Sequence, residues 1–159
     1  LNDEAAATLF QIYSAIEAMK SRGSKPMKNM DDAFKTIAEQ FTINNHLAKL
    51  RLGIRLKTDN SLIGTLLLVK DENSKLQYEI GFSFGQPHWG KGYGQETLRM
   101  VSTQLSTYQN IESIKAWCIK ENFASIRIFE KAGFYEVEQD EYPQSRLFVK
   151  RIKSDTVIK

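Results

Sequence analysis

The chain has 159 residues, 42% of them hydrophobic and 26% charged, which is the size and composition of one ordinary globular domain. Lys and Arg number 22 against 19 Asp and Glu; the net charge of +3 is too small to indicate a dedicated nucleic-acid-binding protein, although it suits a small anionic ligand. The single cysteine, Cys118, excludes an internal disulfide framework and the common cysteine-rich zinc sites.

The sequence contains no segment typical of membrane insertion or export. No apolar stretch approaches the roughly 18 residues that span a bilayer, and the N-terminus lacks a basic segment followed by an apolar run. Together with the lone cysteine, these features predict a soluble, cytoplasmic protein whose partners include neither a membrane nor a nucleic acid.

Apolar residues at helical spacing open the chain. They predict one helix over Leu9 to Met19, a loop over Ser21 to Pro26, and a second helix from Phe34 to Phe41 with Asp31 or Asp32 as its N-cap. Two amphipathic helices are therefore expected at the start of the domain.

The hydrophobic period then changes to two, which is typical of strands. Leu50 to Lys57 and Leu76 to Phe84 are predicted strands of this kind, and the nearly continuous apolar run Leu62 to Val69 is a third predicted strand. The polar segments Asp59 to Ser61 and Asp71 to Lys75 are predicted turns between them. Such short connections favour an antiparallel meander.

Helix and strand alternate in the second half of the sequence. The predicted elements are a helix from Gly94 through Tyr108, a strand over Ile111 to Ile119, a short helix, and strands near Phe134 to Glu138 and Ser145 to Ile152. Asn122 can cap the short helix, and Gly133 can end it because glycine accepts left-handed backbone geometry. A meander followed by this alternation predicts a mixed α/β sheet with helices on its faces.

A glycine-rich segment, Pro87 to Gly94, lies between a predicted strand and a predicted helix. Glycines at alternate positions allow successive N–H groups to converge, and the positive end of the helix adds to them, so this loop can bind a phosphate, with Lys91 supplying a full charge. The alternative is a plain connecting turn. Two known phosphate motifs do not fit, because Gly92 follows Lys91 where a Ser or Thr is required, and Gln95 stands where a dinucleotide fingerprint needs glycine.

Trp89-Gly90-Lys91-Gly92-Tyr93-Gly94 resembles the pyrophosphate loop of the GNAT superfamily of acetyl-coenzyme A dependent N-acetyltransferases. Trp89 replaces the usual Gln or Arg, as in the branch of the ribosomal-protein N-terminal acetyltransferases. The stretch from Asn122 to Phe134 is similar to the family's Asn, Ser, Lys, Gly-Phe pattern on the next helix. The two motifs, separated by one helix and one strand, are more specific together than either is alone.

The resemblance implies a GNAT-like, mostly antiparallel sheet that is splayed between its two central strands, and a coenzyme A site in the gap. Family members also have a strand ahead of the first helix; the domain predicted over residues 1–159 either lacks that strand or has lost residues before Leu1. The residues that the resemblance assigns to coenzyme A are Phe82, Ser83 and Phe84 through their backbone, the loop residues Trp89, Gly90, Lys91, Gly92, Tyr93 and Gly94, and Asn122, Ser125, Phe129 and Lys131.

The reaction implied is direct attack of a neutral amine on the thioester in a ternary complex. Cys118 is typical of a packed core residue, so no acyl-enzyme is expected. Glu79 or Glu141 is the candidate base, each with an ordinary surface glutamate as the alternative. Phe129 occupies the position where many family members have a tyrosine that acts as the acid, which leaves Ser125 to assist the departing thiolate. The alternative is that Ser125 only stabilises the start of the helix.

The remaining polar residues give weaker indications. His46 and His88 have no companions at metal-ligand spacing, so no metal is expected. The basic residues of the first strand, Lys49, Arg51, Arg55 and Lys57, could meet an acidic substrate but are typical of a solvated face. The predicted acceptor is a peptide N-terminus, a polyamine or an aminoglycoside; a homodimer is left open, and a coenzyme A-binding sensor or scaffold without turnover is the alternative function.

Overall fold

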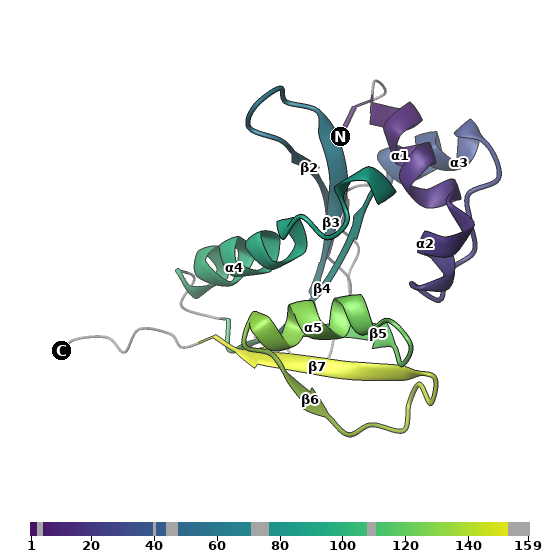
Figure 1. The fold of residues 1–159 in the computed structure, drawn as a ribbon. Coiled ribbons are helices and arrows are strands. Elements are labelled where there is room, and N and C mark those ends of the chain that lie inside the picture. The colour runs from purple at the N-terminus through teal and green to yellow at the C-terminus, as the bar shows by residue number, and fades with distance from the viewer. Residues whose placement is uncertain (3–4, 40, 44–47, 71–76, 108–110, 153–159) are drawn as a thin grey trace.

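The structure, a computed structural model, describes residues 1–2, 5–39, 41–43, 48–70, 77–107 and 111–152 (Figure 1). The predicted turn Asp71 to Lys75, together with Leu76, Tyr108 and His46, lies outside these residues. The elements in chain order are α1 (Ala6–Ser14), α2 (Ile16–Lys20), α3 (Met30–Ala38), β1 (Phe41–Ile43), β2 (Ala48–Arg55), β3 (Leu62–Lys70), β4 (Gln77–Phe84), the 3-10 turn η2 (Gln86–His88), α4 (Tyr93–Ser106), β5 (Ser113–Ile119), α5 (Phe123–Lys131), β6 (Tyr135–Val137) and β7 (Ser145–Arg151).

The strands form one seven-stranded sheet in the order β1-β2-β3-β4-β5-β7-β6. All neighbouring strands are antiparallel except β4 and β5, which are parallel, as a connection through α4 requires. This confirms the predicted mixed, mostly antiparallel sheet and its opening meander.

The central parallel pair is short. The pairing joins Gln77, Tyr78 and Glu79 of β4 to Ser113, Ile114 and Lys115 of β5. No further pairs join these two described strands, although β4 continues to Phe84 and β5 to Ile119. Figure 1 shows β3 and β4 running across the direction of β7 rather than alongside it. The predicted splay between the central strands is therefore confirmed.

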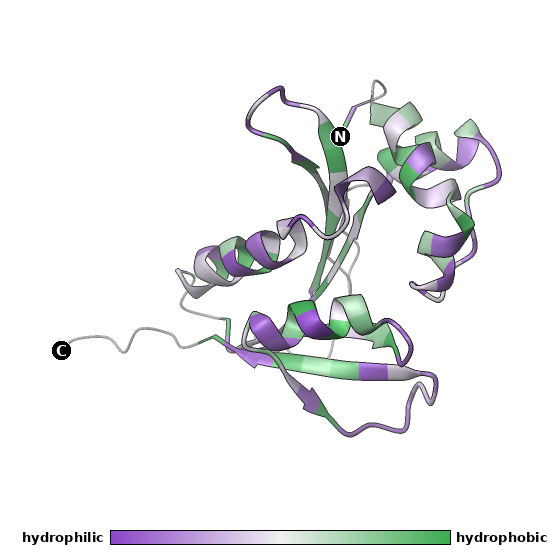
Figure 2. Cartoon of the chain, viewed as in Figure 1, coloured by the Kyte–Doolittle hydropathy of each residue, from purple (hydrophilic) through white to green (hydrophobic). Residues whose placement is uncertain are grey.

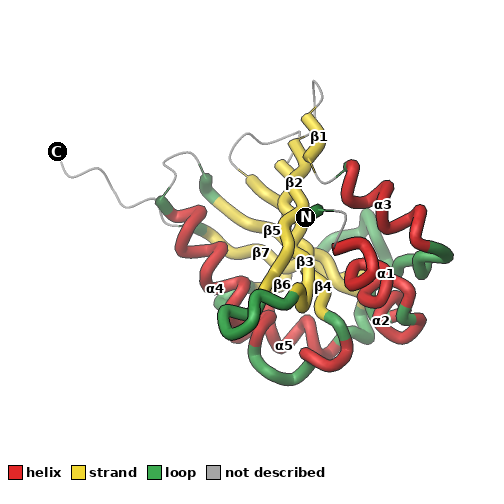
Figure 3. The backbone as a smooth tube through the Cα atoms, turned by 90° about the horizontal axis from the view of Figure 1, so that it is seen from above, coloured by secondary structure: helices red, strands yellow, loops and turns green. Residues whose placement is uncertain are grey.

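Helices cover both faces of the sheet (Figure 3). Leu66 of β3 packs into a core that includes Leu98 of α4 and Phe129 of α5. Its neighbour Thr65 points to the opposite face, where its hydroxyl forms a 2.6 Å hydrogen bond with that of Tyr13 in α1. Figure 2 shows hydrophobic residues along β3 and within α5, and hydrophilic residues along the loop between β6 and β7.

Local structure at the N-terminal end differs from the sequence prediction in three places. The first predicted helix is interrupted at Ala15, whose backbone is extended with ψ of 110°, giving α1 and α2. The N-cap of α3 is Asn29, not Asp31 or Asp32, because the Asn29 amide oxygen accepts a 3.2 Å hydrogen bond from the Asp32 N–H. Phe41 begins strand β1 instead of ending the helix.

None of the described helices combines the length and the apolar character needed to cross a lipid bilayer.

Candidate active site

The glycine loop leads directly into α4, as predicted. Gly90 and Gly92 have φ angles of 73° and 83°, a left-handed geometry that disfavours other residues, and Gly92 is the N-cap of α4. A Cβ atom at either glycine would have no other atom within 4 Å. The loop backbone thus borders open space at the helix end whose first N–H groups have no partner within the helix.

Trp89 fastens this loop to the end of β4. The indole is 46% exposed, and its Nε1–H donates a 2.7 Å hydrogen bond to the carbonyl of Phe84. The Phe84 ring lies 6.4 Å from that of Tyr93 in the first turn of α4. The loop is therefore held beside the strand edge that opens away from β5.

Backbone direction along β4 follows from one hydrogen bond. The N–H of Gly85 donates to the carbonyl of Ile63 at 3.0 Å, and antiparallel pairing alternates along the strand. The backbone groups of Ser83 accordingly face β3, and those of Phe82 and Phe84 face the opening toward β5. Trp89 already occupies the Phe84 carbonyl, so Phe82 is the one of these three residues whose backbone faces the opening with no hydrogen-bond partner among the described residues.

The second motif forms α5, and its cap and its end are confirmed. The side-chain oxygen of Asn122 accepts a 3.0 Å hydrogen bond from the Ser125 N–H. At the other end Gly133 has a φ of 81°, and the N–H of the buried Phe134 donates to the carbonyl of Phe129 at 3.0 Å.

The two motifs meet where α4 and α5 cross. A Cβ atom at Gly94 would lie 2.9 Å from Cδ1 of Ile128 and 3.4 Å from the ring of Phe82, so α5 and β4 both pack closely against the first turn of α4. Phe129 is 3% exposed, and its ring contacts those of Phe82 in β4 and Phe148 in β7 at 5.9 and 5.3 Å between centroids. α5 therefore lies behind the opening and contacts β4 on one side of it and β7, the neighbour of β5, on the other.

Two candidate residues of α5 lie at its opposite ends. Ser125 is half-buried in the first turn, next to the cap, whereas Lys131 is exposed in the last turn, about 9 Å further along the helix axis. The helix thus places Ser125, but not Lys131, beside Asn122.

The two candidate carboxylates lie on the face of the sheet covered by α1 to α3. Glu79 shares this face with Ser83 by strand alternation and belongs to the last paired position before the opening. The hydrogen bond with the Glu141 carboxylate raises the pKa of Tyr142, and the charges of Glu141 and Glu79 act in the same direction. Both carboxylates therefore raise the pKa of the same exposed Tyr142 phenol. The Tyr142 ring packs edge-on against that of Trp117 in β5, with 5.0 Å between centroids.

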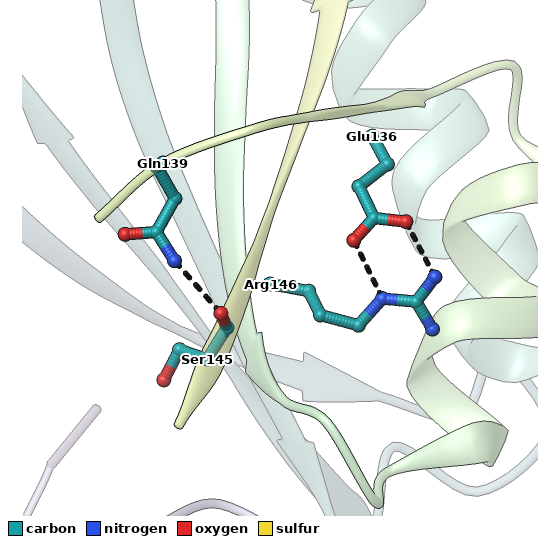
Figure 4. Close-up of polar contacts among 4 residues, drawn as sticks. All are labelled: Glu136, Gln139, Ser145 and Arg146. Atoms are coloured by element: carbon teal, nitrogen blue, oxygen red, sulfur yellow. Dashed lines mark hydrogen bonds and ion pairs between the residues drawn. The ribbon is translucent and has the colours of Figure 1, made fainter. Parts of the chain in front are cut away.

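Gln139 fixes the loop that carries Glu141. Its amide nitrogen donates to the carbonyl of Ser145 at 2.8 Å (Figure 4). The same nitrogen donates to the Tyr142 carbonyl at 3.0 Å, and the Gln139 oxygen accepts from the Tyr142 N–H at 2.8 Å. Beside it, Arg146 and Glu136 form a two-pronged ion pair across β6 and β7, with Nε to Oε1 at 2.8 Å. Residues of this loop also border a pocket of about 360 Å³.

Comparison with known proteins settles the family. The family model described as "Acetyltransferase (GNAT) domain" matches residues 1–135. The chain belongs to the GNAT acetyltransferase family. A relative, the uncharacterized N-acetyltransferase YoaA of Bacillus subtilis (strain 168), is 25% identical over 134 residues, which are 84% of this chain and 76% of that protein.

Solved structures show the same fold. The spermidine N-acetyltransferase of Vibrio cholerae, in complex with CoA and spermine, has a TM-score of 0.75 at 16% identity and covers 96% of this chain and 92% of its own. The aminoglycoside acetyltransferase AAC(6')-Ib in complex with coenzyme A has a TM-score of 0.74 at 16% identity, with 95% and 91% covered. The GNAT fold predicted from the sequence is confirmed.

Burial keeps the one cysteine of this acetyltransferase domain unreactive. Cys118 is 8% exposed, and desolvation raises the pKa of its thiol to about 11, so it is protonated at neutral pH. Among the residues that the structure describes, no group of three His, Cys, Asp or Glu side chains is placed to hold a metal ion.

One polar cluster, on the face of the sheet that α1 covers, was not predicted from the sequence. The Tyr13 hydroxyl accepts hydrogen bonds from Nη1 of Arg22 and Nη1 of Arg51 at 3.0 and 2.8 Å, besides its bond with Thr65. Arg51 is thus half-buried and engaged, whereas Arg55 of the same strand is exposed, as the solvated-face interpretation expects. No local pattern reveals the cluster, because its members come from four separate segments.

Proposed function

We propose that this GNAT domain transfers the acetyl group of acetyl-coenzyme A to a primary amine by direct attack within a ternary complex. The observation that carries the proposal is the end of pairing between β4 and β5 after Glu79 and Lys115, beside the loop that opens α4. Two solved structures with the same fold contain coenzyme A, which supports the same co-substrate here.

The residues present fit coenzyme A. The pyrophosphate would lie against the amides from Gly90 to Gly94, where the positive helix end and the exposed Lys91 favour an anion and no side chain obstructs it. The pantetheine arm would extend along the free edge of Phe82, with Phe129 behind it.

The amine would approach from the opposite face, over Gly81. A Cβ atom at Gly81 would meet only the Cβ of Leu67, at 3.9 Å, so the sheet leaves room there between Glu79 and Ser83. In the transfer a C–N bond forms while the C–S bond breaks, the amine proton passes to a carboxylate, and the thiolate leaves with a proton or hydrogen bond from Ser125. A backbone N–H at Phe82 would stabilise the carbonyl oxygen as it gains charge.

The two carboxylates would act over different distances. Glu79 lies about 10 Å along β4 from Phe82, so it would take the proton through water, whereas Glu141 would act from the loop between β6 and β7, beside Tyr142. An α-amine, with a pKa of about 7.7 to 8.0, needs such a base less than a lysine-like amine of about 10.4. This favours a peptide N-terminus as acceptor, in agreement with the resemblance to the ribosomal-protein branch.

A second function, coenzyme A binding without turnover, is favoured by one observation. Phe129 stands at the tyrosine position, and Ser125 is the one hydroxyl-bearing residue of α5. The domain would then bind coenzyme A as a sensor or scaffold.

Release of free thiol from acetyl-coenzyme A, followed with a chromogenic disulfide, separates the two functions. The panel contains peptides with free N-termini, the same peptides acetylated at the N-terminus as matched controls, and spermidine and an aminoglycoside. We expect thiol release that requires a free amine and yields the acetylated acceptor by mass spectrometry. Tight coenzyme A binding without release for any amine would instead establish the sensor function.

A further inference from the structure

The Tyr13 hydroxyl is the centre of a cationic cluster on the acceptor face. Arg22 follows α2 and Arg51 lies on β2, yet Nη1 of each donates to the same phenol oxygen, at 3.0 and 2.8 Å. Their guanidinium carbons also lie 5.0 and 5.6 Å from the Tyr13 ring centroid. Two like charges are therefore held close together.

The described residues offer these two charges little compensation. Burial alone raises the pKa of Tyr13, but the neighbouring Arg22 and Arg51 charges and the hydrogen bonds of Thr65 and Arg22 outweigh it and lower that pKa. Within the described part of the chain, neither arginine is paired with a carboxylate, and the hydrogen bonds found use only Nη1 of each fork. The other nitrogens can donate to a ligand, and a guanidinium fork suits carboxylate and phosphate oxygens.

The turn that carries Arg22 bridges the open ends of the central strands. Arg22 Nη1 donates to the Ser83 hydroxyl of β4. On the other side the Ser21 carbonyl accepts a 2.7 Å hydrogen bond from Asn122, and a Cβ atom at Gly23 would lie 3.0 Å from Ile119 of β5. Arg22 therefore borders the space over Gly81 at its Ser83 end.

We propose that Arg22 and Arg51 bind an anionic group of the acceptor, so that the preferred substrate is an amine bearing a nearby carboxylate or phosphate. This inference rests on the proposed acetyl transfer and names the substrate class of that same site. The ammonium end lies toward Glu79 and Glu141, and the anionic end lies toward the arginines. Polycations such as spermidine or an aminoglycoside are disfavoured, because their charges meet a guanidinium of like sign.

Matched peptides test this selection. Ala-Asp, Ala-Asn and Ala-phosphoserine peptides of otherwise identical sequence present the same α-amine next to a carboxylate, a neutral amide or a phosphate, and spermidine is the cationic comparison. We expect kcat/KM to be at least about tenfold higher for the Asp peptide than for the Asn peptide, the ratio that one charge-assisted hydrogen bond supplies. The phosphoserine arm shows which anion is preferred.

Four variants assign the preference to its residues. In Arg22→Gln and Arg51→Gln the ratio of kcat/KM for the Asp peptide to that for the Asn peptide should fall toward one. Arg55→Gln removes the same charge from an exposed position on the strand that carries Arg51, and it should keep the ratio. Arg22→Lys should restore part of the ratio, and coenzyme A binding by calorimetry reports whether each variant is folded. A merely structural role for Arg22 would lower all activities together and leave the ratio unchanged.

Two results overturn the inference, and each is distinct from failure of the proposed function. Turnover that is equal for Asp and Asn peptides, or faster for spermidine than for either, refutes acidic selection while acetyl transfer stands. A ratio that survives both arginine substitutions refutes the assignment to this cluster. Absence of thiol release with every amine would refute acetyl transfer itself, and with it the inference.

Discussion

A negative charge introduced at Gly92 tests whether this loop binds pyrophosphate. Gly92 has a φ of 83°, and a Cβ atom there would meet no other atom within 4 Å, so a substitution strains the backbone without disturbing the core. Non-glycine residues in this geometry cost about 1–2 kcal/mol, and Asn and Asp tolerate it best. The pair Gly92→Asn and Gly92→Asp therefore shares shape and strain and differs by one negative charge.

The size of the charge effect follows from Coulomb's law. Two unit charges about 5 Å apart at an effective dielectric constant of about 20 repel by about 3 kcal/mol, and solvent exposure of the loop reduces this value. We expect Gly92→Asp to bind coenzyme A at least about tenfold more weakly than Gly92→Asn, equivalent to about 1.4 kcal/mol.

Titration calorimetry at two ionic strengths measures the effect. The difference between the two variants should shrink as salt rises from about 0.05 to 0.5 M, because salt screens exposed charges. Both variants should keep the far-ultraviolet circular dichroism of the parent chain. Equal affinities for coenzyme A in folded Asn and Asp variants would refute the placement of a phosphate at this loop.

The remaining predictions concern packing, the acceptor face and the proton path. Gly64→Ala should destabilise the fold by about 1–3 kcal/mol in urea unfolding, because its methyl would lie 2.5 Å from the carbonyl oxygen of Ser83 in β4, a backbone atom that cannot move aside; an unchanged midpoint would contradict the close approach of β3 and β4. Gly81→Val should raise the acceptor KM and leave acetyl-coenzyme A affinity unchanged; equal effects on both would argue against separate faces. Ser125→Ala should lower kcat more than it changes KM for acetyl-coenzyme A, and full turnover would exclude its role at the thiolate. If Glu79 or Glu141 is the base, its replacement by Gln should remove the acidic limb of the pH–rate profile; unaltered profiles for both would leave catalysis to backbone donors and positioning.

Sequence patterns predicted the features that depend on neighbouring residues. Alternation of side chains located β2 and β4, a continuous apolar run located β3, and the splay followed from the family resemblance. Asn122 and Gly133 marked the ends of α5, because capping geometry is decided within one helical turn.

Features that depend on distant segments or on backbone direction could not be predicted in this way. Tyr13 and Thr65 are 52 residues apart, and nothing near either residue indicates their contact. The direction of the Ser83 backbone depends on the register between β3 and β4, since a shift of one residue would exchange it with Phe82. No helix-breaking residue such as proline or glycine lies at the interruption at Ala15.

A crystal structure of the complex with coenzyme A and an unreactive peptide acceptor tests the central claim most directly. We expect pyrophosphate oxygens within hydrogen-bond distance of the amides from Gly90 to Gly94, pantetheine between β4 and β5 along Phe82, and the peptide N-terminus over Gly81. Coenzyme A bound outside the β4–β5 opening, or an acceptor on the same face of the sheet as α4 and α5, would contradict that claim.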